Sequence, residues 1–343
     1  MIRASGRALC LLFSLPLVVF GQLACAKTAP EPFYKGKTIY IVVGYGPGGG
    51  YDLHSRLLSR YIRKHIPGNP TVVVQNMAGA GGVRAANHVY QIAPNDGTYI
   101  AAVNEQAAIF QLLGGKGVQY EASKLSWLGS MAHTNNTIYT SNVSGITSLS
   151  DAKGREVTLA GNGVVSAAST FGNILNALIG TKFKIINGYT GTSDSNLALE
   201  RSEVDGGAGA YSSLLTSKPE WLKEKRVKII LQIGFKKEPD LPDVPLLLDV
   251  VSGDEAKQIA TLLTLPTAIG YNHWVSPSVP EERLSILRSA YEAVLLDPEL
   301  LSEAERLRFS IRPKDAAELT ELVRNAAATP KSILDKTAKI VGW

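Results

Sequence analysis

The chain has 343 residues, of which 45% are hydrophobic and 19% are charged, and its formal net charge is +5. This composition indicates a globular protein and excludes a disordered one, while the length exceeds that of one compact core and favours two lobes. The basic excess is small, and lysine and arginine form no long run, so we expect no nucleic-acid partner.

The first 26 residues are predicted to be a signal peptide. Arg3 and Arg7 precede an apolar stretch over residues 8–20, and Ala24-Cys25-Ala26 fits the small-x-small pattern of a cleavage site. The apolar stretch is shorter than the roughly 20 residues that a membrane-spanning helix needs. We therefore expect an exported protein that is located in the periplasm.

Both cysteines, Cys10 and Cys25, lie in this leader. Lipid attachment at Cys25 is the alternative to cleavage after Ala26, although Gln22 stands where a lipobox has an aliphatic residue. Cleavage would leave no cysteine, which excludes a thiol nucleophile, a disulfide and a CxxC metal site. It would also remove Arg3 and Arg7, so the mature chain would have 33 basic and 30 acidic residues, a balance of +3.

A strand, a glycine-rich loop and a helix follow one another twice near the start of the mature chain. Residues 38–43 are an apolar run typical of a buried parallel strand, and a helix with apolar residues at helical spacing is expected over 51–65. Pro67 and Gly68 end this helix. The second cycle has a strand at 71–74, a helix at 83–91 and a further strand at 99–103.

A similar block starts after Ser130. Strands are predicted at 156–160, 183–186, 204–211 and 227–233, with helices at 166–179 and up to Arg201. Three later segments, 280–296, 298–307 and 316–326, are predicted to be helices on the outside of a lobe. Alternating strands and helices predict α/β lobes with mostly parallel sheets and right-handed crossovers.

Glycine-rich loops precede helices at four places, two in each lobe: 44–50, 78–82, 161–163 and 190–195. The start of a helix gathers free backbone N–H groups at the positive end of the helix dipole and binds carboxylates without a charged side chain. Ligands of open α/β sheets bind at these carboxyl ends of strands. The loops therefore favour an anion site, the alternative being that they are tight turns only.

Other kinds of site find little support. Gly44, Gly46 and Gly49 match the dinucleotide pattern, but the next strand ends in Gln75-Asn76, with no acidic residue for a ribose. The five histidines form no metal-binding motif, and no GxSxG elbow occurs, so we expect no enzyme, metal or cofactor. Asp52 opens the first helix, where it either caps and braces the loop or contacts the ligand.

Several motifs together resemble the Bug (TctC-type) extracytoplasmic receptors of tripartite tricarboxylate transporters. Residues 34–52 (YKGKTIYIVVGYGPGGGYD) are similar to the opening of that family, and VQNMAGAGG at 74–82 is similar to its second loop. Further matches are PNDGTY at 94–99, GNG at 161–163, PDLPDVP at 239–245 and VSPSVP at 275–280. The resemblance covers almost the whole mature chain, in the order of the family.

The resemblance implies a two-lobed type II periplasmic-binding fold with two crossovers and a ligand cleft between the lobes. Lobe 1 would comprise 27–131 plus 236–343, and lobe 2 would comprise 132–235. In the family, backbone amides of the first two loops hold a carboxylate, and side chains of the second lobe complete the cleft. The positions carried over are Tyr45, Gly48, Gly49, Ala80 and Gly81 in lobe 1, and Asn162, Thr192, Ser193 and Tyr211 in lobe 2.

The chain departs from the family where charge would matter. Met77-Ala78 stands where an arginine is common, and Thr190 replaces the lysine of a Tyr-Lys-Gly motif. The nearest cation, Arg84, is one turn into the second helix and is expected to face solvent. The cleft is therefore less cationic, which favours a monoanion, a dicarboxylate or a neutral amide over a tricarboxylate.

These observations predict a monomeric, exported receptor that captures a small organic acid and delivers it to cytoplasmic-membrane transporter subunits, without catalysis. One alternative is an exported enzyme of the same shape that acts on a small carboxylate. The other is a ligand sensor that signals to a partner protein.

Overall fold

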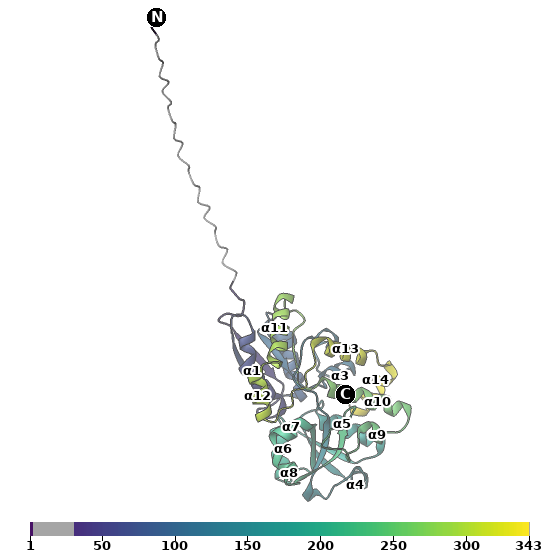
Figure 1. Ribbon diagram of the computed structural model, residues 1–343. Helices are drawn as coiled ribbons and strands as arrows, with labels where there is room; N and C mark the ends of the chain where they lie inside the picture. The colour runs from purple at the N-terminus through teal and green to yellow at the C-terminus, as the bar shows by residue number, and fades with distance from the viewer. Residues whose placement is uncertain (3–30, 343) are drawn as a thin grey trace. The chain divides into compact units, whose positions relative to one another are not determined.

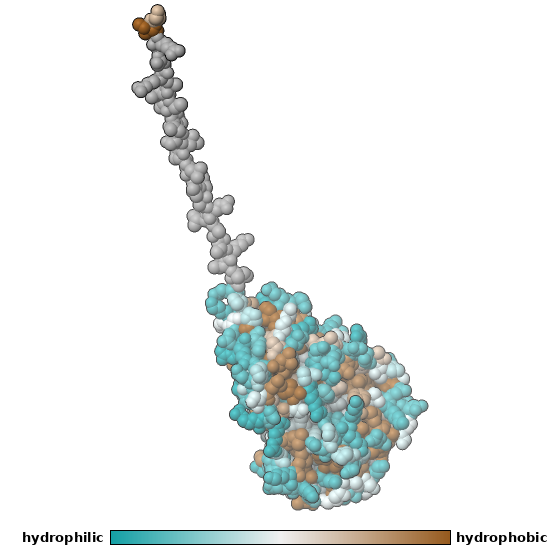
Figure 2. Space-filling view, viewed as in Figure 1, coloured by the Kyte–Doolittle hydropathy of each residue, from teal (hydrophilic) through white to brown (hydrophobic). Residues whose placement is uncertain are grey.

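The computed structural model describes residues 1–2 and 31–342, and Pro32–Trp343 forms one compact unit. Residues 3–26 of the predicted signal peptide, with its cleavage site and Cys25, lie outside the described residues. Within the described part, no helix is long and apolar enough to span a membrane. Figure 2 shows hydrophilic residues over much of the visible face, with smaller hydrophobic patches between them.

The first sheet has five strands in the order β2-β1-β3-β10-β4. Strand β1 is parallel to β2 and β3, and β10 is antiparallel to β3 and β4. The strands are β1 (Thr38–Val43), β2 (Thr71–Asn76), β3 (Tyr99–Ala102), β4 (Ser126–Ser130) and β10 (Asn272–Val275). The sheet is thus mixed, and its parallel part is the one that the sequence predicts.

The second sheet has the order β7-β6-β8-β5-β9. Strand β6 is parallel to β7 and β8, while β5 is antiparallel to β8 and β9. The strands are β5 (Asn136–Ser141), β6 (Val157–Gly161), β7 (Phe183–Asn187), β8 (Gly206–Ala210) and β9 (Val227–Ile233). The chain passes between the two sheets twice, from β4 to β5 and from β9 to β10.

Helices cover both sheets (Figure 1). Those that pack on the first sheet or its neighbours are α1 (Gly50–Ile62), α2 (Val83–Asn87), α3 (Ala107–Leu112), α11 (Glu281–Leu295), α12 (Pro298–Arg306) and α13 (Ala316–Ala327). Those around the second sheet are α4 (Leu149–Gly154), α5 (Ala167–Ile179), α6 (Thr192–Glu200), α7 (Tyr211–Ser217), α8 (Pro219–Lys223), α9 (Leu247–Val250), α10 (Asp254–Ile269) and α14 (Lys331–Val341).

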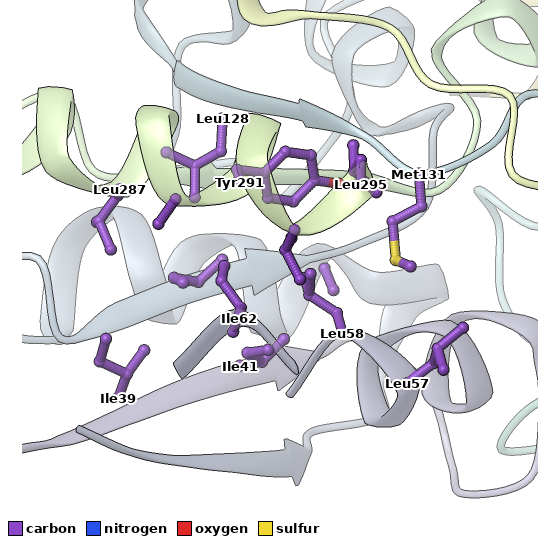
Figure 3. Packing of buried hydrophobic residues seen from close by; sticks show 14 of the residues in the cluster. Ile39, Ile41, Leu57, Leu58, Ile62, Leu128, Met131, Leu287, Tyr291 and Leu295 are labelled. Carbon is purple, nitrogen blue, oxygen red and sulfur yellow. The ribbon is translucent and has the colours of Figure 1, made fainter. Parts of the chain in front are cut away.

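The apolar face of α1 forms the centre of the first core. Leu57, Leu58 and Ile62 are fully buried in the same cluster as Ile41 of β1 and Leu287 of α11 (Figure 3). Their spacing of one, four and five positions places them on one side of the helix, which is why the sequence predicts this face. The core thus holds α1 firmly on the sheet, with its first turn at the end of β1.

The core of the second sheet draws on distant parts of the chain. Leu247 of α9, Leu263 of α10 and Val341 of α14 are buried in the same cluster as Ile138 and Leu159 of the sheet. Residues beyond 236 therefore support both sheets. The predicted lobe boundaries at 131 and 235 stay a prediction.

Candidate functional site

A cavity lies where the loops of the first sheet meet those of the second. Its free space for water-sized molecules is about 60 Å³, which is enough for a few waters. From the first sheet and its connections it is lined by Tyr45, Gly49, Gly50, Tyr51, Asn104, Glu105 and Tyr271. From the second it is lined by Asn136, Asn162, Ala167, Thr192, Ala208, Gly209, Ala210 and Ser213.

The first turn of α1 presents backbone donors to this cavity. Gly49 is the N-cap of the helix and makes no side-chain cap hydrogen bond, and Gly49, Gly50 and Tyr51 all line the cavity. The first N–H groups of a helix have no intrahelical acceptor and lie at the positive end of the dipole. This end of the cavity therefore suits a carboxylate, as the glycine loop predicts.

Asp52 stabilises that loop through a hydrogen bond from Gly48. The Asp52 carboxylate accepts hydrogen bonds from Gly48 N, Arg56 Nε and Asn76 Nδ2, each at 2.9 Å. Burial would raise the pKa of Asp52, but these hydrogen bonds outweigh it and lower the pKa. Asp52 does not line the cavity, and its hydrogen bonds hold the loop in place. Contact of Asp52 or Gly48 with a ligand stays a prediction.

The second loop lies beside a neighbouring hollow. Ala80 lines this hollow together with Asn162, Gly163 and Thr190, and Tyr45 and Asn162 also line the first cavity. Gly81 adopts φ +64° and packs under Val165, so it lines neither space. Arg84 is exposed, in agreement with the expectation that its side chain turns to solvent.

The second-lobe residues predicted from the sequence fall in three different places. Asn162 and Thr192 line the cavity. Ser193 is exposed, and its hydroxyl donates to Pro47 O at 3.2 Å. Tyr211 is buried in an apolar cluster, where burial, with the carboxylates of Asp240 and Glu238, raises its pKa to about 12. Ala210 and Ser213 line the cavity where Tyr211 was expected.

Direct hydrogen bonds join the two sides of the cleft. Gly46 N donates to Thr190 O at 3.2 Å, and Asn104 Nδ2 donates to Val165 O at 2.8 Å. Together with the bond between Ser193 and Pro47, they bring the loops of both sheets into contact. The structure is therefore a closed form, in which the cavity has only a narrow free space.

Sequence reasoning missed several polar residues of the cavity. Asn104 and Glu105 lie two and three positions after the end of β3, and the carboxyl end of a central strand was the available signal. Tyr51 opens the predicted helix directly after the glycine loop, whereas Asn136 and Tyr271 had no comparable signal. Burial raises the pKa of Tyr51 and Tyr271, and the charge of Glu105 raises both further, so these phenols stay protonated donors.

The described residues contain no group of three or more His, Cys, Asp or Glu that could hold a metal ion. The acidic member of the cavity, Glu105, accepts hydrogen bonds from Tyr51 and Asn136. The arrangement can therefore bind a small polar molecule through amides, hydroxyls and one carboxylate.

No protein-family model matches the chain, and no curated protein sequence matches it. Several solved structures are similar to the chain. The periplasmic binding protein BugD is 20% identical, the alignment covers 90% of this chain and 99% of BugD, and the TM-score is 0.67. MatC from Rhodopseudomonas palustris, with bound malate, is 19% identical, with 88% of this chain and 98% of MatC covered and a TM-score of 0.66.

A second R. palustris protein, solved with adipate, is 17% identical, with coverage of 89% of this chain and 97% of that one and a TM-score of 0.68. The structural neighbours are thus periplasmic solute-binding proteins of the Bug and TctC type. The likeness confirms the predicted two-lobed type II periplasmic-binding fold.

Proposed function

We propose that the protein is a periplasmic receptor that closes around a small organic carboxylate and hands it to subunits of a membrane transporter. The observation that carries the proposal is the cavity between the two sheets, where the uncapped first turn of α1 faces hydroxyl and amide side chains. Helix starts of this kind bind carboxylates through backbone N–H groups.

The structural neighbours support the same ligand class. MatC is described with malate and the second R. palustris protein with adipate, and both have the fold of this chain. These neighbours are binding proteins, which supports a receptor without catalysis and a periplasmic location. The proposal includes a monomeric receptor with no cofactor.

A thermal-melt panel tests the proposal. A ligand that binds only the folded protein stabilises it by about 2.7 kcal/mol at a hundredfold excess over its Kd. We expect organic acids or amino acids in the panel to raise Tm clearly, and mass spectrometry of the protein as purified to find a bound carboxylate. A folded protein that responds to no carboxylate in a broad panel would contradict the proposal.

The same ligands separate the receptor from the exported enzyme. We expect each ligand that raises Tm to be recovered unchanged after long incubation with the protein. Conversion of such a ligand, followed by NMR, would favour the enzyme instead.

A further inference from the structure

One acidic side chain lines the cavity and is held in a fixed orientation. Glu105 is half-buried and lies just after β3. Its Oε1 accepts a hydrogen bond from Asn136 Nδ2 at 2.9 Å, and its Oε2 accepts one from the Tyr51 hydroxyl at 2.6 Å. The Glu105 N–H in turn donates to the Tyr51 hydroxyl at 2.9 Å. The carboxylate is therefore locked between an element of each sheet.

Within the part of the chain that the structure describes, no cationic side chain lines the cavity beside this carboxylate. None of the lining residues is lysine, arginine or histidine. The partners of Glu105 are a phenol and an amide, which are neutral. Each carboxylate oxygen has two acceptor sites, so both Glu105 oxygens keep the capacity to accept a further hydrogen bond. The charge and the acceptor capacity together favour a cationic donor supplied by the ligand.

The influence of this charge extends across the cavity. Burial raises the pKa of Tyr45, Tyr51 and Tyr271, and in each case the negative charge of Glu105 raises it further. A like charge in a partly desolvated site is repelled in the same way. A ligand with a second carboxylate near Glu105 would therefore be disfavoured, whereas a protonated amine would be attracted.

We propose that the ligand is a small zwitterion, with its carboxylate at the first turn of α1 and its ammonium group at Glu105. The assignment rests on the proposed receptor function and names its ligand class. The two binding groups, the first turn of α1 and the Glu105 carboxylate, are present in one cavity, since Tyr51 belongs to that turn and also contacts Glu105. The free space of about 60 Å³ suits a molecule of the size of a small amino acid.

Matched pairs of ligands test this assignment by calorimetry. Each pair has the same chain with and without the amine: L-alanine with propanoate, 4-aminobutanoate with butanoate, and L-glutamate with pentanedioate. We expect the intact receptor to bind one amino member at least tenfold more tightly than its partner. Glu105→Gln keeps the size of the side chain and removes its charge, so this preference should fall to less than threefold.

Glu156→Gln, at an exposed position beside Lys184, is the matched control and should leave the preference unchanged. Circular dichroism confirms that each variant is folded. A receptor that binds the plain carboxylates as tightly as the amino members would overturn the zwitterion and leave the carboxylate receptor standing. Tighter binding of neutral amides than of amino acids and plain carboxylates would overturn the zwitterion too. If the intact protein binds no carboxylate at all, the receptor function is overturned as well.

Discussion

Among single residues, Gly50 controls how closely α1 approaches the far wall of the cavity. A Cβ atom at Gly50 would lie 2.5 Å from the Tyr271 hydroxyl and 2.9 Å from Ser213 Oγ. Both neighbours are buried side chains that line the cavity. The absence of a side chain at this position therefore keeps the space beside the first turn of α1 open.

We expect Gly50→Ala to weaken ligand binding by more than tenfold, because the added methyl group displaces Tyr271 into the cavity. Gly154→Ala is the matched control, since a Cβ atom there meets nothing within 4 Å. We expect Arg84→Ala to reduce affinity by less than tenfold, or about 1.4 kcal/mol, because the proposed site holds the anion through backbone amides. Calorimetry checks all three variants, and a large loss in Arg84→Ala alone would point to a salt bridge instead.

Two histidines are buried in neutral surroundings. His54 stacks between Tyr271 and Phe309, with ring centroids 3.9 Å and 4.4 Å away, and burial lowers its pKa to about 4 despite a hydrogen bond to Gly50 O. Burial also lowers the pKa of His273 to about 3, with a smaller contribution from His54. Both groups thus resist protonation in the folded protein.

The low pKa values of His54 and His273 predict that the folded protein loses stability in acid. Between about pH 6.5 and pH 4 the unfolded chain binds protons at these histidines and the folded protein does not, so the free energy of unfolding falls as pH falls. At pH 5 the loss is about 2 kcal/mol for one such group. Denaturant unfolding of His54→Phe, which keeps an aromatic ring and cannot titrate, should show a shallower fall between pH 7 and pH 5. An equally steep fall would assign the sensitivity to other groups.

Between elements, the closed form depends on glycines where the loops of the two sheets meet. Gly163, between β6 and α5, adopts φ +125°, and a Cβ atom there would lie 2.7 Å from Gly81 N and 3.1 Å from Ala80 C. The contacts are backbone atoms, which cannot rotate away. A side chain at Gly163 would therefore hold the loops apart.

We expect Gly163→Ala to reduce affinity and to leave the ligand-bound protein less compact in small-angle X-ray scattering. Gly188→Ala is a close control, since its φ of +127° imposes the same backbone strain while a Cβ atom meets nothing within 4 Å. If both variants lose affinity equally, the cause is strain and not the contact between the loops.

For the molecule as a whole, the compact unit begins at Pro32, a few residues after the predicted cleavage site. We expect the exported protein to have the intact mass of a chain that starts at Lys27. A chain produced without residues 1–26 should have the same Tm as the exported protein. A mass that includes acyl chains on Cys25 would instead establish a lipoprotein.

The local features of this protein follow from its sequence alone. The apolar run of β1, the helical spacing of Leu57, Leu58 and Ile62, and the glycine loop before α1 are short-range patterns. Each is set by the pleat, by the helical period or by the steric freedom of glycine. These patterns were enough to predict an α/β fold and an anion site at the start of α1.

Only the tertiary structure decided which side chains meet in the cavity. Tyr271 lies more than 200 positions after Tyr51, and Asn136 comes from the other sheet, yet both face the cavity with Glu105. Periodicity reports which face of an element is buried and carries no information on its distant partner. For the same reason the sequence does not show that Asp52 accepts hydrogen bonds from Gly48 and Asn76, or that Tyr211 packs in an apolar cluster. Contact of either residue with a ligand stays a prediction.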